Sequence, residues 1–307
     1  MKNITKFLPY TAGYIDGDGC FYIGITIQKP KMITVYEYSI QVLSVKKPVL
    51  DKFCSEFGGY IRKKPDKPRH RTAHCWIIKG QTAAKLAAQI YPFLVDKKEQ
   101  CEMFIEYSDS IYGNNFKTVE RSRIKRRKEL IKLIREERNM NNLVTEEFVR
   151  DLKNRIHTIT PIEDDYPYLA GLIDAEGCFQ ARKWKPKNRP NDVYAISLQI
   201  GNTRIPILPW LMERFGGNAS FSPAKGNRKA SVIWTIEAAA LYKILPKIRP
   251  FLINKQEVCD KLIEFQKTIL PNGGDRHSEL FRALFEKRRE VRERIIKEIH
   301  KLNSKGK

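Results

Sequence analysis

The sequence predicts an α+β protein built as a tandem duplicate, in which each copy forms a four-stranded antiparallel sheet with helices on one face. Three observations predict this fold. The chain matches itself at a shift of 158 residues, each copy contains four segments of alternating apolar and polar residues, and helical segments separate those strands. A chain of 307 residues is long enough for two domains of about 150 residues each.

The internal repeat keeps one register over a long stretch. A shift of 158 residues places Gly13–Asp16 on Gly171–Asp174, and Lys97 on Lys255. Because one register persists from Pro9 to Cys101, the repeat is a duplicated domain rather than a solenoid. The same shift also matches Pro9-Tyr10 with Pro167-Tyr168, Gly19–Phe21 with Gly177–Phe179, Phe57–Gly59 with Phe215–Gly217, Trp76 with Trp234, Pro92–Leu94 with Pro250–Leu252 and Cys101 with Cys259.

Each copy is expected to follow the same order of elements. It begins with a short helix that has a proline at its first position, and the helix between the two strand pairs ends at a glycine pair that suits a C-cap. The expected elements of the first copy are a helix over 9–17, strands over 21–28 and 36–43, a helix over 48–57, strands over 59–64 and 73–79, and helices over 82–90 and 97–112. The second copy repeats the helix over 167–175 and strands over 178–185, 194–201, 220–223 and 231–237.

Helical extensions follow both copies and set the domain boundaries. Residues 119–139 form a basic amphipathic pattern, and 277–297 repeat it with Ser278 as an N-cap. A charge run of this kind is either a solvated helix face or a contact to phosphates beside a bound duplex. We therefore divide the chain into an N-terminal unit over 1–140, a linker over 141–160 that includes a helix near 145–156, and a C-terminal unit over 161–307.

The charge of the chain indicates its partner. It carries 57 Lys and Arg against 35 Asp and Glu, a net charge of +22, which favours nucleic acid and, less strongly, an anionic membrane surface. No run of 18 apolar residues is present, so a transmembrane helix is excluded, and the N-terminus resembles neither a signal nor a transit peptide. The six cysteines form no CxxC pair, which disfavours a zinc site or a disulfide framework and favours buried thiols in a reducing compartment.

Two short stretches carry the chemistry. Ala12-Gly13 and Ala170-Gly171 have little bulk, so the two first helices can approach closely. If they pack about a pseudo-twofold axis, their C-terminal ends meet and bring Asp18 and Glu176 together beside unpaired backbone carbonyls. Oxygen ligands of this kind suit Mg²⁺ rather than zinc, and two facing carboxylates are costly without a cation between them.

These stretches resemble the motifs of a known family. TAGYIDGDG at residues 11–19 and LAGLIDAEG at residues 169–177 are similar to the two motifs of single-chain LAGLIDADG homing endonucleases. The second differs only by Glu176 for Asp, and the first departs at Thr11, Tyr14 and Gly17. The resemblance covers nearly all of residues 7–297. It implies two αββαββα units whose sheets form a saddle over the major groove of double-stranded DNA.

The resemblance also implies roles for individual residues. Asp18 and Glu176 would be the catalytic acids and metal ligands, joined by the backbone carbonyls of Gly17 and Ala175, with Mg²⁺ bound and Mn²⁺ or Ca²⁺ able to take its place. Asp16 and Asp174 would be structural acids that hydrogen-bond the helix end. Further catalytic positions correspond to Lys97, Lys255, Ser44 and Asn202; Pro48 and Pro206 occupy the positions where some relatives carry another basic residue.

DNA contacts are expected from strand residues and from the turns between strands. Basic side chains would contact phosphates and outward strand side chains would read bases, although alternation leaves only about half of the strand positions facing the DNA. The candidates are Gln28, Lys29, Tyr36, Tyr38, Gln41, Arg62, Lys64 and Arg71 in the first copy, and Gln180, Arg182, Trp184, Tyr194, Gln199, Lys225, Arg228 and Lys229 in the second.

The expected function is metal-dependent cleavage of both strands of a long asymmetric DNA target, leaving short 3′ overhangs, by a monomer. The alternatives are an intron RNA maturase of the same fold, for which host intron RNA would be a partner, and a DNA-binding regulator that has lost cleavage. Retention of both acids and both lysines favours the endonuclease. An intracellular location is expected, and a prokaryotic cytoplasm and an organelle that encodes the protein stay open.

Overall fold

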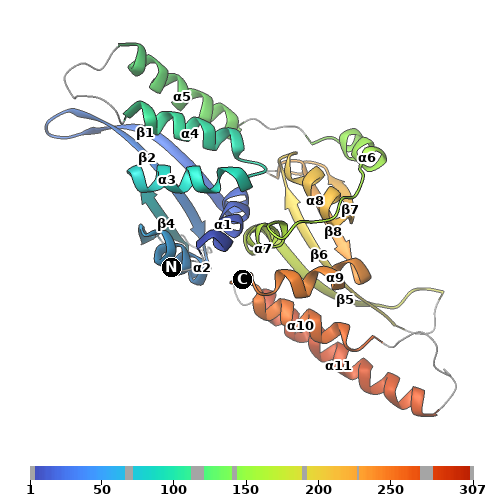
Figure 1. Cartoon of the computed structure of the whole chain (residues 1–307). Helices are drawn as coiled ribbons and strands as arrows, with labels where there is room; N and C mark the ends of the chain where they lie inside the picture. Colours follow the sequence, from blue (N-terminus) through green and yellow to red (C-terminus); the bar gives the residue numbers. More distant parts are fainter. Residues whose placement is uncertain are drawn as a thin grey trace.

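The computed structural model describes residues 4–65, 72–111, 121–139, 144–188, 192–226, 228–269 and 279–304. It confirms the predicted α+β architecture of two repeated units, each with a four-stranded antiparallel sheet. The strands are ordered β1-β2-β4-β3 in the first sheet and β5-β6-β8-β7 in the second. Figure 1 shows the two sheets on either side of a central pair of helices, α1 and α7.

The elements of both units follow the predicted order. The first unit comprises α1 (Ile4–Asp18), β1 (Gly19–Gln28), β2 (Ile33–Ser44), α2 (Lys47–Phe57), β3 (Tyr60–Lys63), β4 (His74–Lys79), α3 (Gly80–Ile90), the 3-10 turn η1 (Tyr91–Phe93) and α4 (Lys98–Ile111). The second comprises α7 (Asp165–Glu176), β5 (Gly177–Trp184), β6 (Val193–Asn202), α8 (Ile207–Phe215), β7 (Asn218–Ser222), β8 (Ser231–Glu237), α9 (Ala238–Ile248) and α10 (Gln256–Gln266). Helices α5 (Arg121–Asn139) and α6 (Glu146–Arg155) connect the units, and α11 (Glu279–Ser304) follows the second.

The first helix of each unit begins earlier than predicted. Pro9 lies inside α1 rather than at its first position, and Pro167 lies within the first turn of α7. The extra turn of α1 is held by packing, because the ring of Phe7 stacks on Tyr10 at 5.1 Å between centroids. A proline costs a helix little only near its N-terminus, so contacts of the preceding turn compensate for Pro9.

Apolar alternation gives each sheet a covered face and an open face. Phe21, Ile23, Ile40 and Val42 are buried between the first sheet and its helices, and the second unit repeats this arrangement. We call the opposite side of each sheet, which no described helix covers, the open face. Its residues occupy the intervening strand positions. The two open faces therefore carry the polar strand residues that the fold leaves accessible.

Both units also share the turn that follows their middle helix. Gly58 ends α2 with φ of 78°, and Gly216 ends α8 with φ of 67°, a left-handed conformation that favours glycine. The indole of Trp76 donates a 2.9 Å hydrogen bond to the Gly58 carbonyl, and Trp234 repeats this bond to Gly216 at 2.8 Å. The glycine pair predicted as a C-cap is confirmed, and the tryptophan explains why the two residue types recur together.

Helices α1 and α7 pack backbone against backbone. A Cβ atom added at Gly13 would lie 2.0 Å from the Tyr168 carbonyl oxygen, and one added at Gly171 would lie 2.0 Å from that of Tyr10. Only glycine permits this separation, because any other residue would place a carbon inside the facing carbonyl. The predicted close approach of the two helices is therefore confirmed, and it fixes how their C-terminal ends meet.

The connecting and terminal helices lie at the outer ends of the molecule. Figure 1 shows α5 beyond the first sheet and α11 beyond the second. Leu130 and Ile134 of α5 are buried, as are Ile295 and Ile299 of α11, so each helix is amphipathic as predicted.

Helix α6 begins at a cap in which the Thr145 hydroxyl accepts a hydrogen bond from the backbone amide of Phe148. The proposed N-cap Ser278 lies outside the described residues. Among the described helices, none is both long and apolar enough to cross a membrane.

Candidate active site

The ends of α1 and α7 bring two carboxylates together. Burial, the adjacent negative charge of Glu176 and a hydrogen bond between the two side chains together raise the pKa of Asp18 to about 7, although Lys97 and Lys255 act in the opposite direction. Gly17 allows this approach, because a Cβ atom there would lie 2.5 Å from the Ala175 Cβ and 3.2 Å from the Glu176 Cγ. The pair is thus held in a geometry that disfavours two negative charges.

The donor set of this pair fits a hard divalent cation. Carboxylate and carbonyl oxygens are the ligands that Mg²⁺ prefers. Within the described residues no group of three or more His, Cys, Asp or Glu side chains could hold a metal, so Asp18 and Glu176 would need backbone or substrate oxygens to complete a shell. The Gly17 carbonyl already accepts a 3.1 Å hydrogen bond from the Lys97 Nζ. Ala175 lies beside Asp18 in the wall of a pocket.

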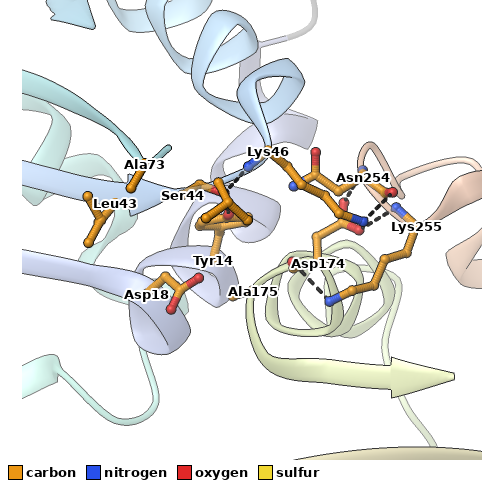
Figure 2. A pocket seen from close by; sticks show the side chains of 11 residues that line it. Tyr14, Asp18, Leu43, Ser44, Lys46, Ala73, Asp174, Ala175, Asn254 and Lys255 are labelled. Atoms are coloured by element: carbon orange, nitrogen blue, oxygen red, sulfur yellow. Dashed lines mark hydrogen bonds between the residues drawn. The ribbon is translucent and has the colours of Figure 1, made fainter. Parts of the chain in front are cut away.

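Two pockets flank the helix pair, and each is built from both units. The first, which we call the Asp18 pocket, has a volume of about 280 Å³ (Figure 2). The second, the Glu176 pocket, has a volume of about 370 Å³. The Asp18 pocket is lined by Tyr14, Asp18, Ser44 and Lys46 of the first unit and by Asp174, Ala175, Asn254 and Lys255 of the second. The Glu176 pocket is lined by Glu176, Asn202 and Arg204 of the second unit and by Asp16, Gly17, Asp96 and Lys97 of the first.

The repeat relates the two pockets residue by residue. A shift of 158 residues converts Asp18 into Glu176, Ser44 into Asn202 and Lys46 into Arg204. It also exchanges the units, so that the acid of one unit shares its pocket with the lysine of the other. Neither unit alone therefore contains a complete pocket.

The two predicted lysines cap the central helices. The Lys97 Nζ donates to the carbonyl oxygens of Ile15 at 2.7 Å, Asp16 at 2.8 Å, Gly17 at 3.1 Å and Gly19 at 2.9 Å. The first three carbonyls belong to the C-terminal end of α1, where the helix dipole favours a cation, and the fourth belongs to the first residue of β1.

Lys255 has the equivalent place at the end of α7. Its Nζ donates to the Asp174 carbonyl at 3.1 Å and to that of Ile173. Burial lowers the pKa of Lys97, and it lowers the pKa of Lys255 to about 8. Both ammonium groups lie at the pockets and are easier to deprotonate than an exposed lysine.

Asp16 and Asp174 are engaged in structural hydrogen bonds. Asp16 accepts from the backbone amides of Val95, Asp96 and Lys97 at 2.8 to 3.2 Å. Asp174 accepts in the same way from Ile253, Asn254 and Lys255 at 2.6 to 3.0 Å. These amides precede α4 and α10, so each acid fixes the segment that carries the lysine instead of bonding the end of its own helix.

Ser44 and Asn202 also lie at the pockets, where they shape the turn after the second strand. The Ser44 hydroxyl accepts a hydrogen bond from the backbone amide of Lys46 at 3.1 Å, and the side-chain Oδ1 of Asn202 accepts one from the backbone amide of Arg204 at 2.8 Å. The turn directs a basic residue to each pocket, which we did not predict from the sequence. The available signal was a basic residue at matching positions of the two repeats, two residues after Ser44 and Asn202 rather than four.

Most of the predicted DNA-contacting residues lie on the open faces or in exposed turns. Strand pairing places Gln41 beside Cys20, and Gln199 beside Cys178, on positions that alternate with the buried core. The Gln180 amide donates to Gln199 at 2.8 Å across this face. Strand alternation puts Gln28, Gln41, Arg62, Lys64, Gln180, Arg182, Trp184 and Gln199 on the open faces, and Lys29, Lys225, Arg228 and Lys229 are exposed in turns.

Three tyrosines predicted to contact DNA face the helices instead. Tyr38 is buried, with its ring packed on Phe104 and Tyr107, because it is in phase with the core residue Ile40. Tyr36 lies under the guanidinium of Arg127 of α5 at 4.7 Å from the ring centre. The prediction that these side chains read bases is wrong.

Tyr194 is the third of these tyrosines, and it also faces the helices because it is in phase with the core residues of its strand. Its hydroxyl donates to Glu293 of α11 at 3.1 Å, and its ring lies 5.5 Å from the Arg292 guanidinium. Arg71 lies outside the described residues. The open faces also present residues that the prediction omitted, because strand phase was not assigned from the sequence; among them are Tyr22, Thr26, Glu37, Ser220 and Thr235.

Comparison with solved structures finds the same fold over most of the chain. I-SmaMI, bound to an uncleaved DNA target in the presence of calcium ions, is 15% identical with a TM-score of 0.61, and the match covers 96% of this chain and 97% of that one. I-SmaMI bound to cleaved DNA is 16% identical with a TM-score of 0.60, over 96% and 95%. The meganuclease I-AabMI, bound to uncleaved DNA, is 16% identical with a TM-score of 0.59, over 93% and 98%.

The sequence comparisons match a smaller part of the chain than the structural comparisons do. No curated protein matches the chain. Residues 11–108 match the model of the LAGLIDADG endonuclease family, and this range contains the C-terminal part of α1, the whole first sheet and most of α4. The second unit repeats a similar motif, the same strand order and a pocket built from equivalent positions. Residues 11–108 therefore match the LAGLIDADG endonuclease family, and the chain as a whole shares the fold of these meganucleases.

Proposed function

We propose that the chain is a site-specific homing endonuclease that hydrolyses both strands of a double-stranded DNA target and leaves short 3′ overhangs. The observation that carries this proposal is the pair of composite pockets at the ends of α1 and α7. Each holds an acid from one unit and a partly buried lysine from the other. Two such pockets, related by the repeat, suit a reaction that is performed twice on antiparallel strands.

A divalent cation is part of the proposal. Asp18, Glu176 and the Ala175 carbonyl would hold Mg²⁺, or Mn²⁺ or Ca²⁺ in its place, and the Gly17 carbonyl would join them once Lys97 moves. When bound, such an ion lowers the pKa of a water molecule and stabilises charge on the leaving oxygen. The raised pKa of Asp18 supports this assignment, because burial and the charge of Glu176 both raise it and a cation would offset the repulsion from Glu176.

The residues of the chain would orient and neutralise the scissile phosphates. Lys97 and Lys255 place positive charge at each pocket, where it would stabilise the negative charge that develops during phosphoryl transfer. Ser44 and Asn202 present polar side chains at the same pocket walls and would orient water. Lys46 and Arg204 bring a second cation to each pocket.

The open faces would supply affinity and sequence selection. Exposed Lys and Arg side chains such as Arg62 and Arg182 would contact phosphates, and Gln41 and Gln199 have the donor and acceptor atoms that read base edges. Because the two open faces carry different side chains, the target is expected to be asymmetric. One chain contains both pockets, so a monomer suffices. The six free cysteines fit an intracellular compartment.

The proposal is tested by selecting a cleavable duplex from a randomised library with the purified protein and Mg²⁺. Cleavage of both strands with 3′ overhangs is expected, and Asp18→Asn should bind the selected duplex without cutting it. Full cutting by Asp18→Asn would remove Asp18 from the catalytic role. If no duplex is cut while intron RNA is bound and folded, the alternative of an RNA maturase takes precedence.

A further inference from the structure

In the Glu176 pocket, the guanidinium of Arg204 is already paired with two carboxylates. The Arg204 Nε donates to the Asp96 carboxylate at 2.8 Å, its Nη2 donates to the Glu137 carboxylate, and its Nη1 contacts the Glu137 carbonyl at 3.4 Å. The side chains of Asp96 and Glu137 are only 1% and 7% exposed, and that of Arg204 is 15% exposed. Asp96 precedes α4 and Glu137 lies on α5, so two elements of the first unit hold a residue of the second.

The corresponding cation of the Asp18 pocket is not held in this way. The repeat shift places Asn254 at the position of Asp96 and Ile295 at the position of Glu137, and neither side chain is charged. Lys46 Nζ donates to the Asn254 carbonyl at 3.4 Å, and within the described residues no carboxylate lies within ion-pair distance of it. Lys46 also contributes to the lowered pKa of Lys255, which places both cations at the same pocket.

This difference changes the charge of the two pockets. The lining of the Asp18 pocket carries two acids and two cations and is neutral, whereas the lining of the Glu176 pocket carries three acids and two cations. Glu137, behind Arg204, adds another negative charge. A scissile phosphate therefore meets an available ammonium in one pocket. In the other it meets excess negative charge and a guanidinium that is paired with two buried carboxylates, from which it is costly to separate.

We propose that the two pockets cut at different rates, with the Glu176 pocket the slower, so that a duplex nicked by the Asp18 pocket accumulates before the double-strand break. Asp96 and Glu137 are positioning residues that set this inequality by holding Arg204. The inference rests on the proposed endonuclease function and adds an order of events to it.

Strand-resolved kinetics test the proposal. The probe is a duplex selected for cleavage from a randomised library, labelled with a different dye on each strand and cut under single-turnover conditions with Mg²⁺. The wild-type rate constants of the two strands should differ on the order of tenfold. Asp96→Asn should bring the ratio towards one by accelerating the slow strand, and Glu137→Gln should act in the same direction.

The matched variant is Asn254→Asp, which introduces an acid beside Lys46 in the other pocket. It should slow the fast strand and also bring the ratio towards one. Impaired folding would lower both rates by the same factor and leave their ratio unchanged, so the ratio separates positioning from stability. Equal rates in the wild type, or variants that leave the ratio unchanged, overturn the inference. Absence of cleavage in both strands contradicts the proposed function itself.

A metal-free measurement examines the same cations directly. Each scissile phosphate is replaced in turn by an uncharged methylphosphonate, and affinity is measured in EDTA by fluorescence anisotropy. Loss of the phosphate charge should weaken binding more on the strand that enters the Asp18 pocket, because Lys46 is available to contact it. Asp96→Asn should make the two losses similar. Equal losses in the wild type would show that Arg204 reaches its phosphate as readily as Lys46, contrary to the proposal.

Discussion

The hydroxyl of Tyr168 donates a 2.6 Å hydrogen bond to the carboxylate of Asp16, and the two residues belong to different units. Tyr10 makes the reciprocal bond to Asp174 at 2.8 Å. Each acid also accepts the backbone amides that lead to the lysine of its own unit. Through these bonds the packing of α1 against α7 is coupled to the positions of Lys97 and Lys255.

Removing one of these hydroxyls should destabilise the protein and disturb one pocket. Tyr168→Phe leaves a buried carboxylate with one donor fewer, so the free energy of unfolding should fall by about 1.5–3 kcal/mol in denaturant titrations. Tyr10→Phe should give a similar loss, since its bond to Asp174 is equivalent. A loss below the error of the measurement for both variants would show that the amide donors alone satisfy the two acids.

The glycines between the central helices should not tolerate a methyl group. Gly13→Ala places a Cβ atom against the Tyr168 carbonyl and should lower the free energy of unfolding by about 3 kcal/mol, because two backbones must separate. Gly171→Ala should do the same. Gly201→Ala is the control, since no atom lies within 4 Å of a Cβ atom added there and its φ is not positive. Comparable thermal unfolding of all three variants would contradict the close packing.

The carboxylate pair should make the metal-free protein less stable as pH rises. The pKa of Asp18 is raised from 3.8 to about 7, so the folded state binds this proton more tightly than the unfolded state, and stability should fall as pH increases between these values. Asp18→Asn should remove that fall and be more stable than the wild type at pH 8 by about 1–3 kcal/mol, with little difference below pH 4. Thermal unfolding across pH in EDTA measures this difference.

Addition of Mg²⁺ provides the companion measurement for the carboxylate pair. The ion should raise the melting temperature of the wild type at pH 8 and have much less effect on Asp18→Asn, because the variant lacks one of the two charges that would bind it. An equal increase for both proteins would place the cation elsewhere.

The lysines should affect rate more than affinity. Lys97→Ala or Lys255→Ala should slow single-turnover cleavage on the order of a hundredfold, since positive charge is lost where negative charge develops. Dissociation constants for the duplex should change only a few-fold. Equal losses in rate and affinity would make both lysines simple phosphate contacts.

The same variants should differ in stability. Lys97 bonds four carbonyl oxygens and Lys255 bonds two, so Lys97→Ala should be the more destabilising substitution in a denaturant titration. The opposite order would argue against the capping role of Lys97.

Two strand residues that the sequence predicted to contact DNA, one on an open face and one on a covered face, should affect DNA binding and stability in opposite ways. Arg182→Ala should weaken DNA binding and reduce its salt dependence by about one unit of slope while leaving stability nearly unchanged, because the side chain is exposed. Tyr38→Ala should instead destabilise the fold by about 3 kcal/mol, because a buried ring is removed. Anisotropy over a salt series and thermal unfolding distinguish the two.

The repeat allowed the sequence to predict the fold and the meeting of Asp18 with Glu176. Alternation located the strands, and small residues in both motifs indicated the helix pair. The face of the sheet on which each strand residue lies was harder to predict. Tyr36 and Tyr38, for example, combine an apolar ring with a polar hydroxyl and fit either face. Packing decides between the faces, and packing is a property of the whole sheet.

The pocket residues show a different limit of sequence reasoning. Lys46 and Arg204 are brought to the pockets by the turn geometry that Ser44 and Asn202 impose, so no spacing rule for a helix or strand predicts them. The pairing of Arg204 with Asp96 and Glu137 joins residues that are far apart in the chain. Such contacts depend on how the two units are placed, which a repeat alone does not specify.

The interlocked glycines and tyrosines of α1 and α7 also bear on how new target specificities could be assembled. Exchanging one half of this protein with the half of a relative would combine open faces that read different half-sites. Such a chimaera needs a glycine wherever the facing helix presents a carbonyl, and a tyrosine wherever it presents a buried acid. Four positions, Tyr10, Gly13, Tyr168 and Gly171, therefore determine which halves can be recombined, and they are separate from the residues proposed to contact DNA.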